Sequence, residues 1–428
     1  MVIGVRRRDV IEATGGPRRI EPRATTTKTR KVQREQQRID AMGEQSAAEA
    51  FIDHRALAAN ARLAADCAQG REVIGVVKAN AYGHGAVEVA KTLVAQGCRR
   101  LAVVSVGEAI ALREAGIGSP QILLLAGLQR EGDAAQAVAQ NLTPVLHGRE
   151  DFEFALAAGR RQGRPLPVHV EVDTAMTRMG VPREQAAAFL AQVAVAPELD
   201  LDGAFTHFSR ADDEDLEPCL EQLSIFRGVL ARASEQGAVP RSIHVANSAG
   251  LLVGKPLFDA LPQATAVRPG LMLYGVRPGP HLGDGLKAVM RLETQVVRVE
   301  TVEAGRPVGY GAQFCAKAQS RIATLPLGYA DGIPCATAGR GQVWIAGQRY
   351  PIAGRVSMDY IGVDLGSGPA GQAVGVGHRA VIFGNAGVEA NGISVEEAAA
   401  WAGTIPYEPL VRVGQRVVRR DIAPSSDG

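Results

Sequence analysis

The stretch Val73-Ile74-Gly75-Val76-Val77-Lys78-Ala79-Asn80-Ala81-Tyr82-Gly83-His84-Gly85 places a lysine directly after an apolar run. Residues 73–77 have the length and composition of a buried strand, and a Gly-His-Gly turn leads into a helical pattern. Burial lowers the pKa of a lysine, and the neutral amine can form a Schiff base with a carbonyl group. A lysine at a strand end more often extends its ammonium group to the rim, so this stretch alone favours a structural role.

Eight short β-rich runs follow one another, separated by Ala-, Leu-, Glu- and Arg-rich stretches with helical spacing. The runs cover residues 73–77, 101–105, 121–125, 143–146, 168–172, 201–206, 243–246 and 265–268. Strands that alternate with helices form a parallel sheet. Their number and spacing predict an α/β fold with a (β/α)8 TIM barrel. A doubly wound open sheet is the alternative, but the first run lacks the Gly-rich phosphate loop typical of that fold.

The pattern changes near residue 286, where short β segments punctuated by glycines begin. One helix is expected over 394–402, with Ser394 as N-cap and Glu397 completing a capping box. We therefore expect three segments: a disordered basic leader over 1–46, the barrel over 47–285 and a mostly-β domain over 286–428. The leader is either a basic tail for an anionic partner or the product of a start assigned upstream of Met42.

Composition limits the class of protein. The net charge of +2 gives no argument for nucleic-acid or membrane binding, and residues 1–40 hold eleven Lys/Arg against five Asp/Glu. No apolar run reaches the roughly 18 residues of a transmembrane helix. The five cysteines are odd in number and lack C-x-x-C spacing, which predicts a reduced, cytoplasmic protein.

Chemistry in such barrels collects at the carboxyl ends of the strands. The candidates that follow the predicted strands are Lys78, Tyr82, Glu171, Arg178, His207, Asn247, Ser248, Arg268 and Gly270. Each alone has an ordinary structural explanation, but their gathering on one rim is hard to attribute to chance. Ser248 and the backbone N–H groups around Gly270 lie in the loops that usually bind phosphate, and no ligand set of metal type is visible. A Schiff-base lysine facing a phosphate cradle indicates pyridoxal 5'-phosphate.

The motifs of residues 48–421 resemble those of the bacterial alanine racemases, pyridoxal-phosphate enzymes of fold type III, in their order along the chain. The motifs are Val77-Lys78-Ala79-Asn80-Ala81-Tyr82-Gly83-His84-Gly85, Val172-Asp173-Thr174-Ala175-Met176-Thr177-Arg178-Met179-Gly180, Thr206-His207-Phe208, Ala246-Asn247-Ser248-Ala249, Val267-Arg268-Pro269-Gly270, Val308-Gly309-Tyr310-Gly311, Pro326-Leu327-Gly328-Tyr329-Ala330-Asp331-Gly332, Gly354-Arg355-Val356-Ser357-Met358-Asp359 and Thr404-Ile405-Pro406-Tyr407-Glu408.

The resemblance implies interconversion of L-alanine and D-alanine by two bases, supplying D-alanine for peptidoglycan. Lys78 would bind the cofactor covalently and act as one base, and Tyr310 of the partner subunit in a homodimer would be the other. Two bases are needed because a proton leaves one face of Cα and returns to the opposite face. A tyrosine titrates near pH ~10, so it needs a cation such as Arg178 beside it to act as a base near neutrality.

The resemblance assigns binding roles to further residues. The phosphate would be held by Tyr82, Ser248, Gly270 and Tyr407. Arg268 would face the pyridine nitrogen with support from His207. The substrate carboxylate would contact Arg178 of the same subunit and the backbone of Met358 of the partner subunit. Tyr329 would narrow the entrance.

This chain departs from the family at Glu171, where many relatives have a lysine that is often carbamylated, and at Ala175 and Ser357. We expect Glu171 to supply an anion directly and to orient Arg178. Two alternatives stay open: a broader-specificity or serine racemase of the same fold, and a non-catalytic pyridoxal-phosphate-binding protein. The latter class consists of single barrels without a β domain.

Overall fold

Eight parallel strands form a closed barrel in the computed structural model, which describes residues 48–422. The strands are β2 (Glu72–Val76), β3 (Arg100–Val103), β4 (Gln121–Leu124), β5 (Leu142–Leu146), β6 (Leu166–Asp173), β8 (Leu199–Phe205), β9 (Ser242–Val245) and β10 (Ala266–Val267). Pairing of β5 with β6 closes the ring, and the two-residue strand β7 (Val181–Pro182) adds to β6 outside it. The predicted (β/α)8 barrel is confirmed, whereas the predicted leader over 1–46 lies outside the described residues.

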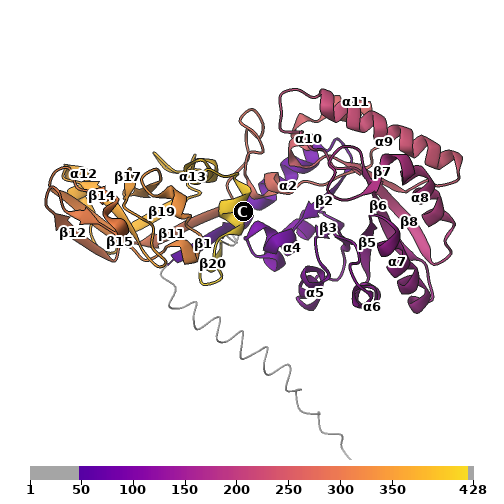
Figure 1. Ribbon diagram of the computed structural model, residues 1–428, viewed down its shortest axis with the longest axis horizontal. Coiled ribbons are helices and arrows are strands. Elements are labelled where there is room, and N and C mark those ends of the chain that lie inside the picture. The colour runs from indigo at the N-terminus through magenta and orange to yellow at the C-terminus, as the bar shows by residue number, and fades with distance from the viewer. Residues whose placement is uncertain (1–47, 423–428) are drawn as a thin grey trace, which may run out of the picture. The chain divides into compact units, whose positions relative to one another are not determined.

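Helices pack around the outside of these strands, as Figure 1 shows for α5 to α9 and α11. The barrel helices are α2 (His54–Cys67), α4 (Ala86–Ala95), α5 (Val106–Glu114), α6 (Glu131–Ala139), α7 (Arg149–Gln162), α8 (Arg183–Val195), α9 (Glu217–Glu235), α10 (Ser248–Val253) and α11 (Lys255–Ala260). Helix α6 has a weak amphipathic period, because four of its nine residues are alanine and Val138 is its one large apolar residue.

A second sheet of nine strands, mostly antiparallel, follows the barrel, which confirms the predicted strand-rich C-terminal part. Its order is β12 (Arg298–Val302), β15 (Ser320–Leu325), β18 (Ile361–Gly366), β17 (Gln348–Ala353), β16 (Gln342–Ile345), β19 (Arg379–Phe383), β11 (Met290–Gln295), β1 (Ala48–Asp53) and β20 (Val418–Ile422). Strands β11 and β12 follow each other closely in sequence but lie apart in the sheet. Helix α13 (Val395–Ala402) begins with the predicted capping box, in which Ser394 accepts from the N–H of Glu397.

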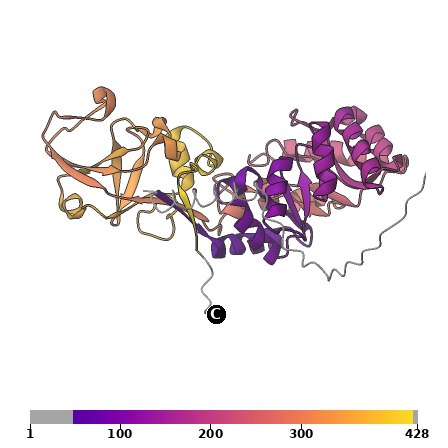
Figure 2. The same cartoon turned by 90° about the horizontal axis from the view of Figure 1, so that it is seen from below.

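The first described strand, β1, belongs to this second sheet although it precedes the barrel in sequence. It pairs antiparallel with β11 and parallel with β20, and its indigo ribbon runs among the orange and yellow strands in Figures 1 and 2. The chain therefore enters the barrel from the second sheet and returns to it. No helix in the described residues is long and apolar enough to cross a membrane.

Candidate active site

A cavity of about 710 Å³ opens at the carboxyl ends of the barrel strands, a volume typical of small-molecule sites. It brings together eight of the predicted site residues from separate parts of the sequence. These are Lys78, Tyr82, Arg178, His207, Ser248, Arg268, Gly270 and Tyr407. Glu171 and Asn247 line the same cavity. The residues chosen by the strand-end rule therefore line one cavity.

Lys78 follows β2 and begins a turn of unusual backbone conformation, labelled α3 (Lys78–Tyr82). Ala79, Asn80, Ala81 and Tyr82 all have φ between 53° and 54°, so the chain makes a left-handed turn that costs energy for residues with a side chain. His84 stabilises it by directing Nδ1 at the carbonyl oxygens of Ala81 and Tyr82, both at 2.9 Å. The turn folds Tyr82 back into the same cavity as Lys78.

The amine of Lys78 is largely desolvated. Burial lowers its pKa below the usual value, and the positive charges of Arg178 and Arg268 lower it further, against the opposing effect of Glu108 and Glu171. The surroundings therefore favour the neutral, nucleophilic amine.

An anion cradle faces this lysine. The Oγ of Ser248 accepts from the backbone N–H groups of Gly270 (3.0 Å) and Met272 (3.1 Å), so its own O–H proton is left to donate. The rings of Tyr82 and Tyr407 lie 6.0 Å apart, and burial raises the pKa of both phenols, which keeps them neutral donors. Such a group of donors without a carboxylate suits a phosphate.

Arg268 is held by four of its five N–H donors. Its Nη1 donates to the Nδ1 (3.0 Å) and the carbonyl oxygen (2.9 Å) of His244, and its Nη2 to the carbonyl oxygen of Thr206 (2.9 Å) and to Nδ1 of His207 (3.4 Å). Within residues 48–422, the Nε–H has no partner, which leaves this donor for a ligand in the cavity. Burial lowers the Arg268 pKa to about 10, so the guanidinium stays charged at neutral pH.

His207 is a neutral imidazole in this setting. Burial and the charge of Arg268 lower its pKa to about 3. Because its Nδ1 accepts from Arg268, the proton lies on Nε2.

We expect Glu171 to orient Arg178, and within residues 48–422 no ion pair joins these two side chains directly. In the described part of the chain, the Glu171 carboxylate instead contacts Nε2 of His147 at 3.1 Å. His147 Nδ1 in turn contacts Asp151 at 3.1 Å. The physical reason is that His147 directly follows β5, which pairs with the strand that carries Glu171, so its ring lies within reach of the Glu171 carboxylate.

Tyr310 and Met358 do not line this cavity. Their exposed fractions are 69 % and 52 %, and Tyr329 is 46 % exposed. The N–H of Tyr329 donates to the carbonyl oxygen of Ser357 at 3.0 Å, so the Tyr329 and Met358 turns lie side by side. Within one chain, Lys78 therefore lines the cavity, whereas Tyr310, Tyr329 and Met358 lie outside it.

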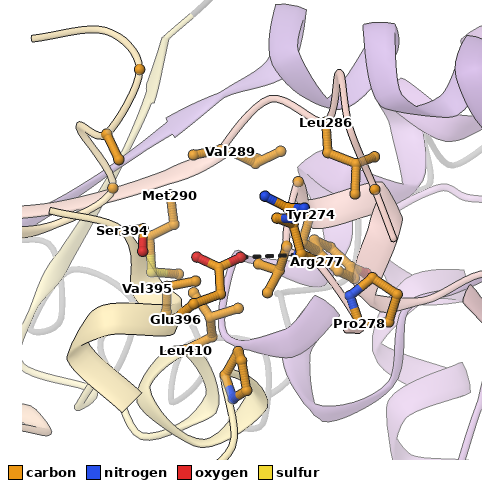
Figure 3. A pocket seen from close by; sticks show the side chains of 18 of the residues that line it. Tyr274, Arg277, Pro278, Leu286, Val289, Met290, Ser394, Val395, Glu396 and Leu410 are labelled. Atoms are coloured by element: carbon orange, nitrogen blue, oxygen red, sulfur yellow. Dashed lines mark hydrogen bonds between the residues drawn. The ribbon is translucent and has the colours of Figure 1, made fainter. Parts of the chain in front are cut away.

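A second cavity, of about 720 Å³, contains none of the predicted site residues (Figure 3). It lies between the segment after β10 and the start of α13, where the N–H of Arg277 donates to Glu396 at 3.0 Å. The Arg277 side chain is itself paired with Asp284 at 3.2 Å. Its charged groups satisfy one another, so we assign no chemistry to it.

Sequence reasoning missed several groups around the site. His147 directly follows a predicted strand, so the strand-end rule applied evenly would have found it. Glu108 completes a capping box with Ser105 that is visible in the sequence, and its Oε1 accepts from the N–H of Ala79 at 2.6 Å. His169 and His244 interrupt apolar strands, and such polar residues in a barrel interior need partners.

At the mouth of the (β/α)8 barrel, a desolvated lysine faces an anion cradle and a tethered arginine. Together with the second, β-rich part of the chain, this arrangement is typical of a barrel enzyme whose chemistry depends on a lysine. Comparison with known proteins narrows the class. Family models described as "Alanine racemase, N-terminal domain" and "Alanine racemase, C-terminal domain" match residues 52–278 and 289–421. The chain belongs to the alanine racemase family, which confirms the expected amino-acid racemase.

Relatives in this family cover most of the chain. The alanine racemase of Syntrophobacter fumaroxidans is 38% identical over 85% of this chain and 94% of its own length. That of Sorangium cellulosum is 39% identical over 81% and 91%. Among solved structures, alanine racemase from Streptomyces lavendulae has a TM-score of 0.82 at 34% identity, covering 89% of this chain and 98% of that one. The Bartonella henselae structure, described with covalently bound pyridoxal phosphate, has a TM-score of 0.78 at 30% identity, covering 88% and 100%.

Proposed function

We propose that this chain interconverts L-alanine and D-alanine with pyridoxal 5'-phosphate bound covalently to Lys78. The observation that carries the proposal is the lowered pKa of Lys78 in a cavity that also contains an anion cradle and a free Arg268 donor. When bound, the cofactor makes the Cα–H of an attached amino acid acidic. The residues of this chain supply the proton transfers and the binding contacts.

The residues present fit the cofactor. Ser248 uses both acceptor positions on backbone N–H groups, so its buried hydroxyl proton needs an external acceptor. A Cβ on Gly270 would lie 2.4 Å from the Tyr82 phenol oxygen, so the glycine keeps room for this donor. The phosphate is therefore assigned to Tyr82, Ser248, Gly270 and Tyr407, and the pyridine nitrogen to Nε of Arg268.

Racemisation needs a base on each face of Cα. Lys78 Nζ lies inside the cavity and takes or returns the proton on one face. We assign the base on the other face to the hydroxyl of Tyr310 of the partner subunit. Tyr310 is exposed and does not line the cavity of its own chain, so it is accessible to a second chain. Arg178, which lines the cavity, stabilises the phenolate of that tyrosine and the substrate carboxylate. Met358 of the partner subunit meets the same carboxylate, and the active form is a homodimer.

The test is a chiral assay of the purified protein with L-alanine, D-alanine and L-serine. We expect conversion of alanine in both directions, and loss of both the activity and the cofactor absorbance band in Lys78→Ala. Faster conversion of serine than of alanine would favour the broader-specificity or serine racemase. Cofactor binding without any racemisation would favour the non-catalytic binding protein. Retained turnover in Lys78→Ala would overturn the assignment of this lysine.

A hybrid experiment tests the shared site. Lys78→Ala and Tyr310→Ala are each expected to be inactive, and co-expression should restore about a quarter of the wild-type activity, because half of randomly formed dimers are hybrids with one intact site. Absence of any recovery would show that both bases come from one subunit. A D-alanine auxotroph that expresses the wild-type chain should grow without added D-alanine. Such growth would support a cytoplasmic role in supplying D-alanine for peptidoglycan.

A further inference from the structure

A continuous row of buried polar side chains runs from Arg268 through the inside of the barrel, away from the cavity. Nη1 of Arg268 lies 3.0 Å from Nδ1 of His244, Nε2 of His244 lies 2.7 Å from Nδ1 of His169, and Nε2 of His169 lies 3.1 Å from Oδ2 of Asp202. We name these four residues the imidazole network. Three strands and the end of a fourth contribute to it, so it depends on closure of the barrel.

The two ends of the imidazole network fix the proton positions along it. An arginine can only donate and a carboxylate can only accept. His244 Nδ1 must therefore be unprotonated, so its proton lies on Nε2 and is donated to His169. His169 Nδ1 must then accept, and its proton lies on Nε2 and is donated to Asp202. Every hydrogen bond points from Arg268 to Asp202, and no other arrangement of neutral imidazoles satisfies all three contacts.

The environment keeps both imidazoles neutral. The rings of His169 and His244 are fully buried, and burial lowers the pKa of each, with Arg268 lowering it further. Gly203 makes space for this arrangement, since a Cβ there would lie 2.4 Å from Nδ1 of His169. Phe205 packs against the Arg268 end of the network, with its ring centre 4.6 Å from that of His244 and 4.3 Å from the Arg268 guanidinium.

Asp202 is held as a carboxylate at the far end of the barrel, where the strands begin. Its Oδ2 accepts from Gln121 at 2.9 Å, and its Oδ1 from Nη2 of Arg241 at 3.0 Å. Arg100 adds a second cation at 3.6 Å from Oδ2. These donors and the His169 bond hold the pKa of Asp202 well below its usual range, against the effect of burial.

We propose that Asp202 is a positioning residue for Arg268, acting through His169 and His244 from the opposite end of the barrel. Its carboxylate sets the direction of all three hydrogen bonds, and this fixes the guanidinium so that only Nε–H is left for the cavity. A buried network of this kind orients a group well only when every member is satisfied. The proposal deepens the proposed function, on which it rests, by adding residues that never touch cofactor or substrate.

The first test needs neither activity nor cofactor. ¹⁵N spectra of the full chain, labelled at its histidine imidazoles, report which ring nitrogen carries the proton. We expect the rings of His169 and His244 each to be neutral and protonated at Nε2, and we identify each by the loss of its signals in His169→Gln or His244→Gln, which also separates them from the neutral ring of His207. A proton on Nδ1 of either ring, or a doubly protonated ring at neutral pH, would overturn the proposal.

The second test compares two neighbouring carboxylates on β8. Asp202→Asn removes the charge at the end of the imidazole network, whereas Asp200→Asn removes a charge that binds the same Arg241 but contacts no histidine. In the holoenzyme, we expect Asp202→Asn to shift the cofactor absorbance and to lower kcat on the order of tenfold with little change in KM. Asp200→Asn should change neither. Equal effects of the two variants, or none from Asp202→Asn, would overturn the proposal.

Gly203→Ala gives an independent check should Asp202→Asn fold poorly. The added methyl group pushes the His169 ring and leaves the Asp202 charge in place. We expect the same spectral shift and kcat loss, and an unchanged cofactor spectrum would count against the imidazole network. A wild-type chain that lacks racemase activity yet shows both Nε2–H imidazoles would instead refute the proposed function alone.

Discussion

His147 Nε2 lies 3.1 Å from Glu171 Oε2, and both side chains are at least nine-tenths buried beside the cavity. The other imidazole nitrogen lies 3.1 Å from Asp151, so one histidine bridges two carboxylates. Burial would lower the pKa of His147, but the two carboxylates outweigh it and raise that pKa to about 9. The His147 ring is therefore protonated at neutral pH and lies between the carboxylates of Glu171 and Asp151. This contact fixes the Glu171 carboxylate on the cavity wall.

The first prediction concerns stability as a function of pH. Because the folded pKa of His147, about 9, lies above its unfolded value, its contribution is fully present below pH ~6.5 and is lost as the pH rises through about 9. We expect His147→Gln to cost on the order of 2–3 kcal/mol at pH ~6 and much less at pH ~10. Denaturant unfolding at both pH values measures this. The exposed His281→Gln is the control, and an equal cost at both pH values would refute the bridge.

The second prediction concerns the charge of Glu171, the one acidic residue among those that line the cavity in the described chain. Glu171→Gln leaves the guanidinium groups of Arg178 and Arg268 there without a carboxylate and weakens the bond from His147. We expect activity to fall on the order of tenfold, and added bicarbonate to have no effect on the wild type. Steady-state kinetics of this variant and of the exposed Glu150→Gln provide the comparison. Wild-type activity in Glu171→Gln would show that the carboxylate is dispensable.

The third prediction separates a binding contact from a structural one at two serines. Ser248→Ala removes the acceptor of two buried N–H groups and the donor assigned to phosphate, so both stability and cofactor affinity should fall, stability by about 1–3 kcal/mol. Ser394→Ala removes the N-cap of α13 and should cost about 1 kcal/mol without changing cofactor affinity. Spectroscopic titration of the apoprotein, with thermal unfolding, distinguishes the two. Unchanged affinity in Ser248→Ala would contradict the phosphate assignment.

The fourth prediction concerns the space above Gly270. An alanine there would place Cβ 2.4 Å from the Tyr82 hydroxyl oxygen and 3.0 Å from the ring carbon that carries it. We expect Gly270→Ala to lower apoprotein stability by about 1–3 kcal/mol. Tyr82→Phe removes the nearer atom, so the double variant should recover part of the loss in thermal unfolding. Additive effects of the two substitutions would mean that the methyl group and the phenol do not meet.

Much of the fold was predictable because its signals are local. Each of the eight barrel strands is a short β-rich run, and helices such as α9 have a clear apolar period. The strand-end rule then placed Lys78, His207 and Ser248 on one rim, since parallel strands in a closed barrel bring their carboxyl ends together. Strand β1 was not predicted, because its partners β11 and β20 lie more than 200 residues away in sequence.

The sequence by itself determined the barrel, the second β-rich part and the residue types at the mouth of the barrel, because strand periodicity and motif spacing depend on neighbours along the chain. Only the tertiary structure decided which charges pair. Glu171 lies seven positions before Arg178, yet its hydrogen bond comes from His147, which follows the adjacent strand β5. Asp202 and Arg268, likewise, are joined by two histidines from two other strands. Such pairings depend on distances across the closed barrel, which no local pattern encodes.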